Sequence, residues 1–121
     1  MAKTIMVVDD SSSLRQVVRM ALESAGYQVL EAGDGQAALA LLDGRQINMV
    51  VCDVNMPKLD GISFVKQAKQ LPAYRFLPVL MLTTESSEEK KQAGKAAGAK
   101  AWMLKPFSPS SMLAAVAKFC A

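Results

Sequence analysis

The stretch TIMVVDD at residues 4–10 decides the fold class, because a short run of apolar and β-branched residues ends there in two adjacent carboxylates. Comparable apolar runs follow at residues 28–32, 49–52 and 78–82, and a weaker fifth run lies at 101–104. Short apolar runs with little polar alternation are typical of strands that are buried on both faces. We therefore predict five strands.

Segments with helical character separate and follow these runs. They are residues 14–22, 37–42, 62–68, 90–97 and 112–119. Gly26, Gly44 and Gly98 follow three of them, where a residue in the left-handed conformation commonly ends a helix. Strands that alternate with helices predict an α/β fold of the (βα)5 kind. In such a fold a doubly wound parallel sheet is covered by helices on both faces through right-handed crossovers.

The starts of several helices are also marked in the sequence. Residues 86–89 have the Ser-Ser-Glu-Glu spacing of a capping box. Ser108 offers an N-cap and Pro109 favours the first helical position. Asp34 and Asp60 precede helical segments as candidate caps. These signals agree with the predicted order of strands and helices.

Length and composition describe an ordinary globular protein. The chain has 121 residues, so we predict a single domain over residues 1–121. With 51% apolar and 21% charged residues it can bury a core without disulfides or a structural metal, and Cys52 and Cys120 are interpreted as free thiols. The first apolar run is too short for a signal peptide or a membrane span. We therefore expect a cytoplasmic protein that contacts no membrane.

Charge and the absence of histidine narrow the chemistry. The sequence contains no His, which excludes His-based acid–base catalysis, the Ser-His-Asp triad and the commonest transition-metal ligand. The net charge of +3 includes a local excess of lysine within residues 90–100, interpreted as a solvated helical face or as a docking face for an acidic peptide. The members of that excess are Lys90, Lys91, Lys95 and Lys100. No Arg-rich run or RNP-like aromatic pattern is present, so no nucleic-acid partner is expected.

Polar residues of related chemistry follow four of the five predicted strands. Asp9 and Asp10 follow the first, Asp53 the third, Thr83 the fourth and Lys105 the fifth. If the strand order is 2-1-3-4-5, the first and third strands flank the switch point where ligands bind in open α/β sheets. Three carboxylates in one crevice repel each other unless a cation neutralises them, and oxygen ligands alone suit Mg²⁺. A nearby Lys and Thr suit phosphoryl oxygens, so the set predicts a phosphoryl-acceptor site with one carboxylate as nucleophile.

Each of these residues also has a structural explanation. Asp9 and Asp10 can cap the first helix, Asp53 can open a turn, Thr83 can simply end a strand and Lys105 can neutralise a carboxyl cluster. Taken together, these explanations leave unexplained why residues of matching chemistry end four strands and skip the second. We therefore prefer the phosphoryl-acceptor interpretation.

Over essentially its whole length, the sequence resembles the response-regulator receiver family and its CheY-type chemotaxis members. The matching motifs are VVDDS at 7–11, DVNMP at 53–57 with DG at 60–61, LTT at 82–84 and KPF at 105–107. The resemblance implies the flavodoxin-like strand order 2-1-3-4-5, which CheY itself exemplifies. It also implies that Asp53 accepts the phosphoryl group, and that Asp10, with Asp9 close by, holds Mg²⁺ together with Asp53 and the backbone carbonyl of Asn55.

The resemblance assigns further roles near the site. Thr83 and Lys105 are expected to contact the phosphoryl oxygens, and the bond after Lys105 is expected to be a cis peptide. Thr83 and Trp102 form the expected switch pair, although the family usually has Tyr or Phe where this sequence has Trp102. Asn55 and Glu85 are expected to modulate the reaction.

These roles lead to a functional hypothesis. We expect a stand-alone, monomeric phosphoacceptor switch, not an enzyme in the usual sense. Because the chain ends one helix after the fifth strand, its output is expected to be docking, and the resemblance implies that the docking face consists of the fourth helix, fifth strand and fifth helix. The implied partners are a CheA-type histidine kinase, a flagellar motor-switch protein and a phosphatase. A phosphate sink or phosphorelay shuttle is the alternative within the same fold. An aspartyl-phosphate phosphohydrolase is the alternative of another class, although its acid–base carboxylate is replaced here by Asn55.

Overall fold

The computed structural model describes residues 2–56, 58–83 and 88–120, and within them one parallel sheet has the strand order β2-β1-β3-β4-β5. The strands are β1 (Thr4–Val8), β2 (Gln28–Ala32), β3 (Met49–Asp53), β4 (Val79–Thr83) and β5 (Ala101–Leu104). Each strand pairs with its neighbour in parallel register. The predicted fold class and strand order are therefore confirmed.

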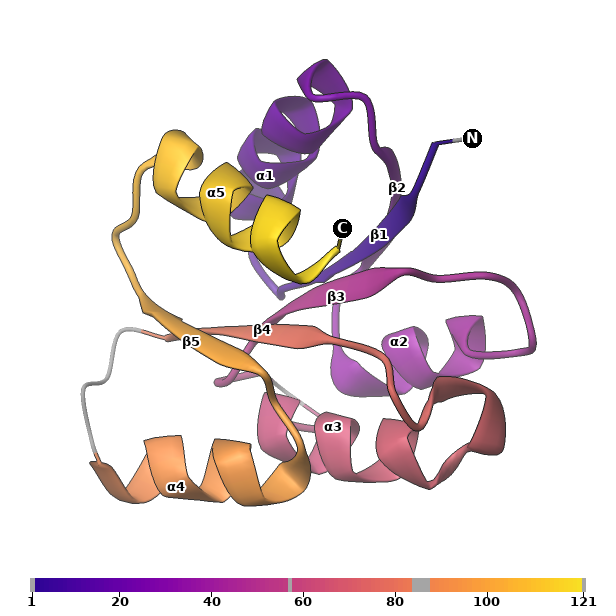
Figure 1. The fold of residues 1–121 in the computed structure, drawn as a ribbon. Helices are drawn as coiled ribbons and strands as arrows, with labels where there is room; N and C mark the ends of the chain where they lie inside the picture. The colour runs from indigo at the N-terminus through magenta and orange to yellow at the C-terminus, as the bar shows by residue number, and fades with distance from the viewer. Residues whose placement is uncertain (1, 57, 84–87, 121) are drawn as a thin grey trace.

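Helices cover both faces of this sheet. They are α1 (Ser12–Ser24), α2 (Gly35–Leu41), α3 (Gly61–Gln70), the 3-10 helix η1 (Pro72–Tyr74), α4 (Glu88–Ala97) and α5 (Pro109–Phe119). Figure 1 shows α1 and α5 together on one face, and α2, α3 and α4 on the opposite face. Among the described helices, none combines the length and the apolar character needed to cross a membrane.

The sheet divides the core into two clusters of buried side chains. Along β1, Ile5 and Val7 pack with α1 and α5, whereas Met6 and Val8 pack with α2 and α3. This alternation follows from the two-residue period of a strand. Both faces are apolar because both carry helices, which explains why the strand sequences show no polar alternation.

The ends of the elements largely follow the predicted signals. Asp34 and Asp60 accept hydrogen bonds from the backbone N–H groups three residues on, each at 2.8 Å, and so cap α2 and α3. Ser108 caps α5 in the same way at 3.1 Å. Gly26 and Gly98 have φ of 95° and 112°, the left-handed region that favours glycine. Part of the predicted capping box at 86–89 lies outside the described residues.

Three strand boundaries differ by one residue from the prediction. The third and fourth strands continue to Asp53 and Thr83, because Asp53 still pairs in register with Leu82 and Thr83 with Leu104. The fourth strand starts at Val79 and leaves out Pro78, whose nitrogen has no hydrogen to donate to a ladder. Two of the candidate site residues thus belong to the sheet itself, whose hydrogen bonds hold their backbones.

Candidate functional site

The predicted carboxylates meet at the carboxyl edge of the sheet, beside the ends of β1 and β3. Asp9, Asp10 and Asp53 each offer one oxygen, and these atoms lie within 4.8 Å of one another. Asp9 and Asp53 are buried, whereas Asp10 is exposed. The set can therefore bind a small cation that is reached from solvent on the Asp10 side. Its donors are all carboxylate oxygens, which fits Mg²⁺ better than a soft transition metal.

Lys105 connects two of these carboxylates. Its Nζ lies 3.1 Å from Oδ2 of Asp9 and 3.3 Å from Oδ1 of Asp53. The backbone N–H of Lys105 donates to the Thr83 carbonyl at 2.7 Å, and the bond to Pro106 is cis. The ammonium is therefore held at the site by the end of β5, as the sequence position predicted.

Burial and charge act together on the two central groups. Burial raises the pKa of Asp53, and the negative charge of Asp9 raises it further, while Lys105 and the backbone N–H of Asn55 act in the opposite direction. For Lys105, burial lowers the pKa, but its hydrogen bond to Asp9 and the charge of Asp53 raise it more. Two close carboxylates with one shared ammonium leave the site short of positive charge, which is what a bound cation supplies.

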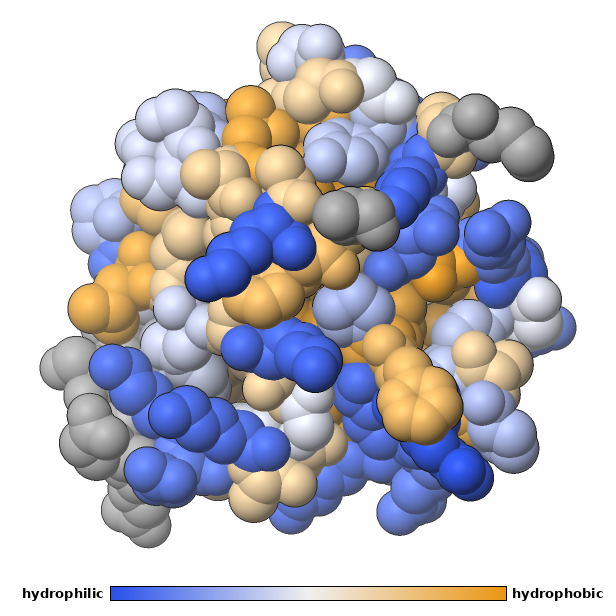
Figure 2. Space-filling model, viewed as in Figure 1, coloured by the Kyte–Doolittle hydropathy of each residue, from blue (hydrophilic) through white to orange (hydrophobic). Residues whose placement is uncertain are grey.

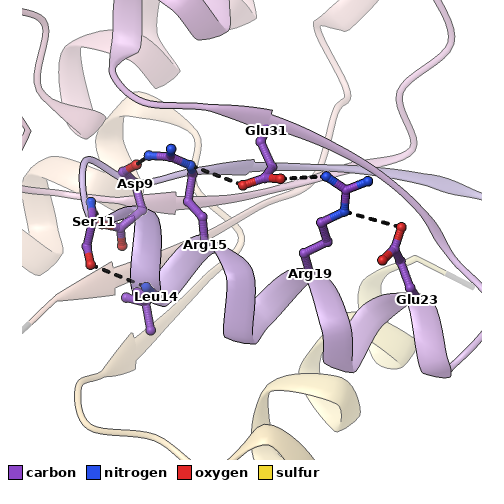
Figure 3. A network of polar contacts seen from close by, with 7 residues as sticks. All are labelled: Asp9, Ser11, Leu14, Arg15, Arg19, Glu23 and Glu31. Atoms are coloured by element: carbon purple, nitrogen blue, oxygen red, sulfur yellow. Dashed lines mark hydrogen bonds and ion pairs between the residues drawn. The ribbon is translucent and has the colours of Figure 1, made fainter.

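Asp9 is held by the turn between β1 and α1. The backbone N–H of Ser11 donates to Oδ1 of Asp9 at 2.8 Å, and the Ser11 hydroxyl in turn caps α1 by accepting from Leu14 N–H at 3.2 Å. The Arg15 guanidinium donates to the backbone carbonyl of Asp9 (Figure 3). The N-cap of α1 is therefore Ser11 and not Asp9 or Asp10, and the Asp9 carboxylate instead holds the backbone just before the helix.

Arg15 also belongs to an ion network that the sequence patterns did not predict. Its Nε lies 3.2 Å from Glu31 of β2, and Arg19 contacts the other oxygen of Glu31 at 2.7 Å and Glu23 at 3.3 Å (Figure 3). The hydrogen bond from Arg19 lowers the pKa of Glu31 more than partial burial raises it. The network ties α1 to β2 and so supports the turn that carries Asp9. Arginines four residues apart on one helix are the available sequence signal, but the sequence does not identify their partner.

Gly61 gives the Asp53 backbone its close support. Its N–H donates to the Val54 carbonyl at 2.9 Å, and a Cβ at this position would lie 2.2 Å from the carbonyl oxygen of Asp53. The first turn of α3 therefore lies directly against the end of β3. In the Asp-Gly pair at 60–61, the Asp side chain caps α3 and the Gly allows the helix backbone to approach the Asp53 carbonyl. These two roles explain both residue types.

The predicted switch residues lie on the same face of the sheet. Thr83 is fully buried at the end of β4, and Trp102 pairs in register with Met81, two residues earlier on that strand. The Trp102 ring packs against α4 at Gly94, where a Cβ would lie 2.6 Å from the ring. Its indole Nε1 is buried and has no hydrogen-bond partner among the described residues. Trp102 therefore lies between β5 and α4, on the side of the sheet that Thr83 faces.

Of the two predicted modulating residues, the structure describes only Asn55. Asn55 is exposed just beyond the end of β3, and its backbone N–H interacts with the Asp53 carboxylate. Glu85 lies outside the described residues.

Comparison with known proteins identifies a matching family and a similar solved structure. The family described as "Response regulator receiver domain" matches residues 5–117. Among solved structures, the chemotaxis protein CheY4 of Vibrio cholerae superimposes with a TM-score of 0.94 at 44% identity, over 98% of this chain and 99% of that chain.

Two curated sequence relatives are transcriptional regulatory proteins. The alkaline phosphatase synthesis transcriptional regulatory protein PhoP of Bacillus subtilis is 41% identical over 96% of this chain and 48% of its own length. The phosphate regulon transcriptional regulatory protein PhoB of Pseudomonas aeruginosa is 36% identical over 93% of this chain and 49% of its own length. The chain spans about half the length of these two curated relatives.

Proposed function

This chain belongs to the response-regulator receiver family, and from that premise we propose that it is switched by transfer of a phosphoryl group to Asp53 from a histidine kinase. The observation that carries the proposal is the position of Asp53 at the end of β3, with its carboxylate 3.3 Å from the Lys105 ammonium and beside Asp9 and Asp10. The chain acts as a cytoplasmic phosphoacceptor, and its own residues assist the transfer and the later hydrolysis.

The reaction at Asp53 is a displacement at phosphorus. A carboxylate oxygen of Asp53 forms a new P–O bond while the bond from phosphorus to the donor's imidazole nitrogen, or to the acetate oxygen of acetyl phosphate, breaks. The donor's leaving group keeps the electron pair. Lys105 is placed to pair with a phosphoryl oxygen and Thr83 to donate its hydroxyl to another, so both stabilise charge on the transferring group. We also assign modulating roles to Asn55 and Glu85.

We assign the metal-binding role to Asp9, Asp10, Asp53 and the backbone carbonyl of Asn55. Mg²⁺ bound there would neutralise charge on the transferring phosphoryl group. The spacing of the carboxylate oxygens and the all-oxygen donor set support this assignment. Asp10 is the exposed member, so it is the carboxylate that meets an incoming hydrated ion first.

Replacing Asp10 with Ala is expected to weaken Mg²⁺ binding by about tenfold or more, because the variant loses a charged ligand. Quenching of Trp102 fluorescence by Mn²⁺, displaced by Mg²⁺, measures the affinity. Asp43→Asn is the matched control, since Asp43 is exposed and paired with Arg45 away from the site. Unchanged Mg²⁺ affinity in Asp10→Ala would remove Asp10 from the metal site.

Phosphorylation is proposed to reach a partner through α4, β5 and α5. The added group brings roughly −1.5 to −2 charge and strong acceptor oxygens, which draw the Thr83 hydroxyl toward it. Movement of Thr83 changes the space on the face where Trp102 lies against Gly94 of α4. The Trp102 ring then repacks and alters the surface of α4 and β5.

Beryllofluoride with Mg²⁺, which mimics the bound phosphoryl group, is expected to shift the emission of Trp102, the only Trp in the chain. Thr83→Ala should reduce that shift by more than half, because the hydroxyl that follows the mimic is missing. The Trp102 emission of both proteins is measured while beryllofluoride is titrated in, and native mass spectrometry confirms that the mimic is bound. An equal shift in Thr83→Ala would contradict the coupling between these residues.

For the output we propose chemotaxis, with a CheA-type kinase as donor and a flagellar motor-switch protein as target. The match to CheY4 over nearly the whole of both chains supports this choice. A second candidate, the receiver part of a transcriptional regulator, is favoured by the relatives PhoP and PhoB. Binding of the beryllofluoride-activated protein to purified motor-switch fragments, compared with Asp53→Asn, decides between them: activation-dependent binding supports the motor. A phosphate sink would accept phosphoryl groups without binding this target.

A further inference from the structure

We propose that the end of the molecule opposite the phosphorylation site carries a second docking surface, centred on Phe76 and three basic side chains, which binds an acidic peptide segment of a protein partner. Phe76 is 86% exposed and lies between η1 and β4, at the amino ends of the strands. Among the described large hydrophobic side chains it is the most exposed. Its neighbours in the surface are Lys69, Arg75 and Lys100. We call these four residues the Phe76 surface.

Phe76 is held in solvent by a rigid turn. The N–H of Leu77 donates to the carbonyl of Tyr74 at 3.1 Å, which places Arg75 and Phe76 at the two central positions of the turn. The residues on either side are anchored, because Tyr74 and Leu77 are only 5% and 6% exposed. The Tyr74 hydroxyl donates to the Arg45 carbonyl at 2.7 Å. The exposure of Phe76 is therefore imposed by its buried neighbours.

Lys69 connects this turn to the end of α4. Its Nζ donates to the carbonyl of Leu77, directly after Phe76, while its aliphatic stem passes Gly98. Burial lowers the pKa of Lys69 and the nearby charge of Lys100 lowers it further. The Lys69 amine thus lies near a second basic group in this surface.

The charges of the Phe76 surface are not balanced within the described chain. No ion pair to a carboxylate is formed by Lys69, Arg75 or Lys100 in the part that the structure describes. The sequence is uneven in the same sense, since residues 61–121 hold nine basic and three acidic residues, and all three acidic residues lie within 85–89. Residues 1–60 hold five basic and eight acidic residues. Net charges of +6 and −3 follow for the two parts.

The shape of the surface suits side chains of a peptide. Phe76 lines a hollow of about 360 Å³ together with Lys69, Arg75 and Lys100, and a second hollow of about 250 Å³ lies on its other side, against Ile47. In Figure 2, hydrophilic side chains gather around hydrophobic surface where Figure 1 draws the segment between α3 and β4. Rigid aromatic anchors beside Arg are typical of interface residues that contribute most to affinity.

An acidic peptide fits these features better than other anionic partners do. Its carboxylates would pair with Arg75 and Lys100, and an apolar side chain would occupy the hollow that Phe76 shares with Lys69. A single aromatic residue offers little depth for insertion into a lipid surface and only one platform for stacking on nucleic acid. Because the surface lies at the amino ends of the strands, we expect it to bind in both the phosphorylated and the unphosphorylated protein.

The test is selection from a phage-displayed library of random short peptides on the unmodified full chain. Enriched peptides are expected to be acidic with at least one apolar residue, and to bind Phe76→Ser and Arg75→Glu at least about tenfold more weakly in fluorescence anisotropy. Lys91→Glu is the matched charge control on α4, and Met20→Ser replaces another exposed hydrophobic residue, 63% exposed on α1. Both controls should bind like the native protein.

Several results would overturn the proposal. These are enrichment of neutral or basic peptides only, no enrichment over the naive library, or full binding by Phe76→Ser. Loss of binding in Lys91→Glu with retention in Arg75→Glu would assign the peptides to the face beside Trp102. Phe76-dependent binding to anionic phosphatidylglycerol vesicles without peptide binding would make the surface a lipid site. Phe76-dependent dimers in sedimentation would make it a self-association site.

Discussion

Replacing Asp53 with Asn is expected to abolish phosphorylation by acetyl phosphate with Mg²⁺, with labelling reduced by on the order of 100-fold or more. The amide keeps nearly the same shape but its oxygen is a far weaker nucleophile than a carboxylate oxygen. Asp9 does not substitute for it, because one of its carboxylate oxygens accepts from Ser11 N–H and the other pairs with Lys105. Intact-mass spectrometry measures the fraction of protein that carries the group.

The matched control for this variant is Asp43→Asn, which makes the same chemical change at an exposed residue paired with Arg45. It should be labelled to the same extent as the native protein. If Asp53→Asn were labelled like the control, the acceptor would be another side chain and the proposed function would be wrong. A circular dichroism melt of each variant excludes loss of folding as the cause.

Replacing Gly61 with Ala is expected to destabilise the protein by roughly 2–4 kcal/mol and to lower the labelling of Asp53. The new Cβ would lie 2.2 Å from the Asp53 carbonyl oxygen and 2.9 Å from the end of the Met81 side chain. A side-chain end can move, but a backbone oxygen in the sheet cannot move without shifting α3 or the end of β3. Urea unfolding followed by Trp102 fluorescence gives the free energy of unfolding.

Gly33→Ala is the control for this experiment. A Cβ there would lie 3.5 Å from the end of the Arg15 side chain, an ordinary van der Waals distance. It should change the free energy of unfolding by less than about 1 kcal/mol. Equal stability of Gly61→Ala and the native protein would show that α3 shifts freely from β3, and would contradict the support of Asp53 described above.

Much of the fold and of the site follows from local sequence. Asp9 and Asp53 were identified because each ends a buried apolar run, and parallel strands bring such ends to one edge of a sheet. The strand boundaries at Asp53 and Thr83 were missed by one residue, because a polar side chain at the end of a strand does not prevent its backbone from pairing. The first polar residue after an apolar run marks the end of the apolar core, but backbone pairing in the sheet continues through that residue.

Other features depend on contacts that no local pattern contains. The pairing of Arg15 and Arg19 with Glu31 joins a helix to a strand, and several carboxylates along the chain are chemically equivalent candidates. The exposure of Phe76 is another case, since a Phe before Leu-Pro suggests a core residue. Only the anchoring of Tyr74 and Leu77 in three dimensions turns Phe76 outward. Such placements are set by packing between elements.

The central claim is that Asp53 itself receives the phosphoryl group. Treating the native protein with acetyl phosphate and Mg²⁺, reducing it with borohydride and sequencing its peptides by mass spectrometry tests this most directly, because borohydride converts an aspartyl phosphate to homoserine. We predict homoserine at position 53, and only when Mg²⁺ is present. Homoserine at Asp9 or Asp10, or a phosphate that resists borohydride on a Ser or Thr, would contradict the claim.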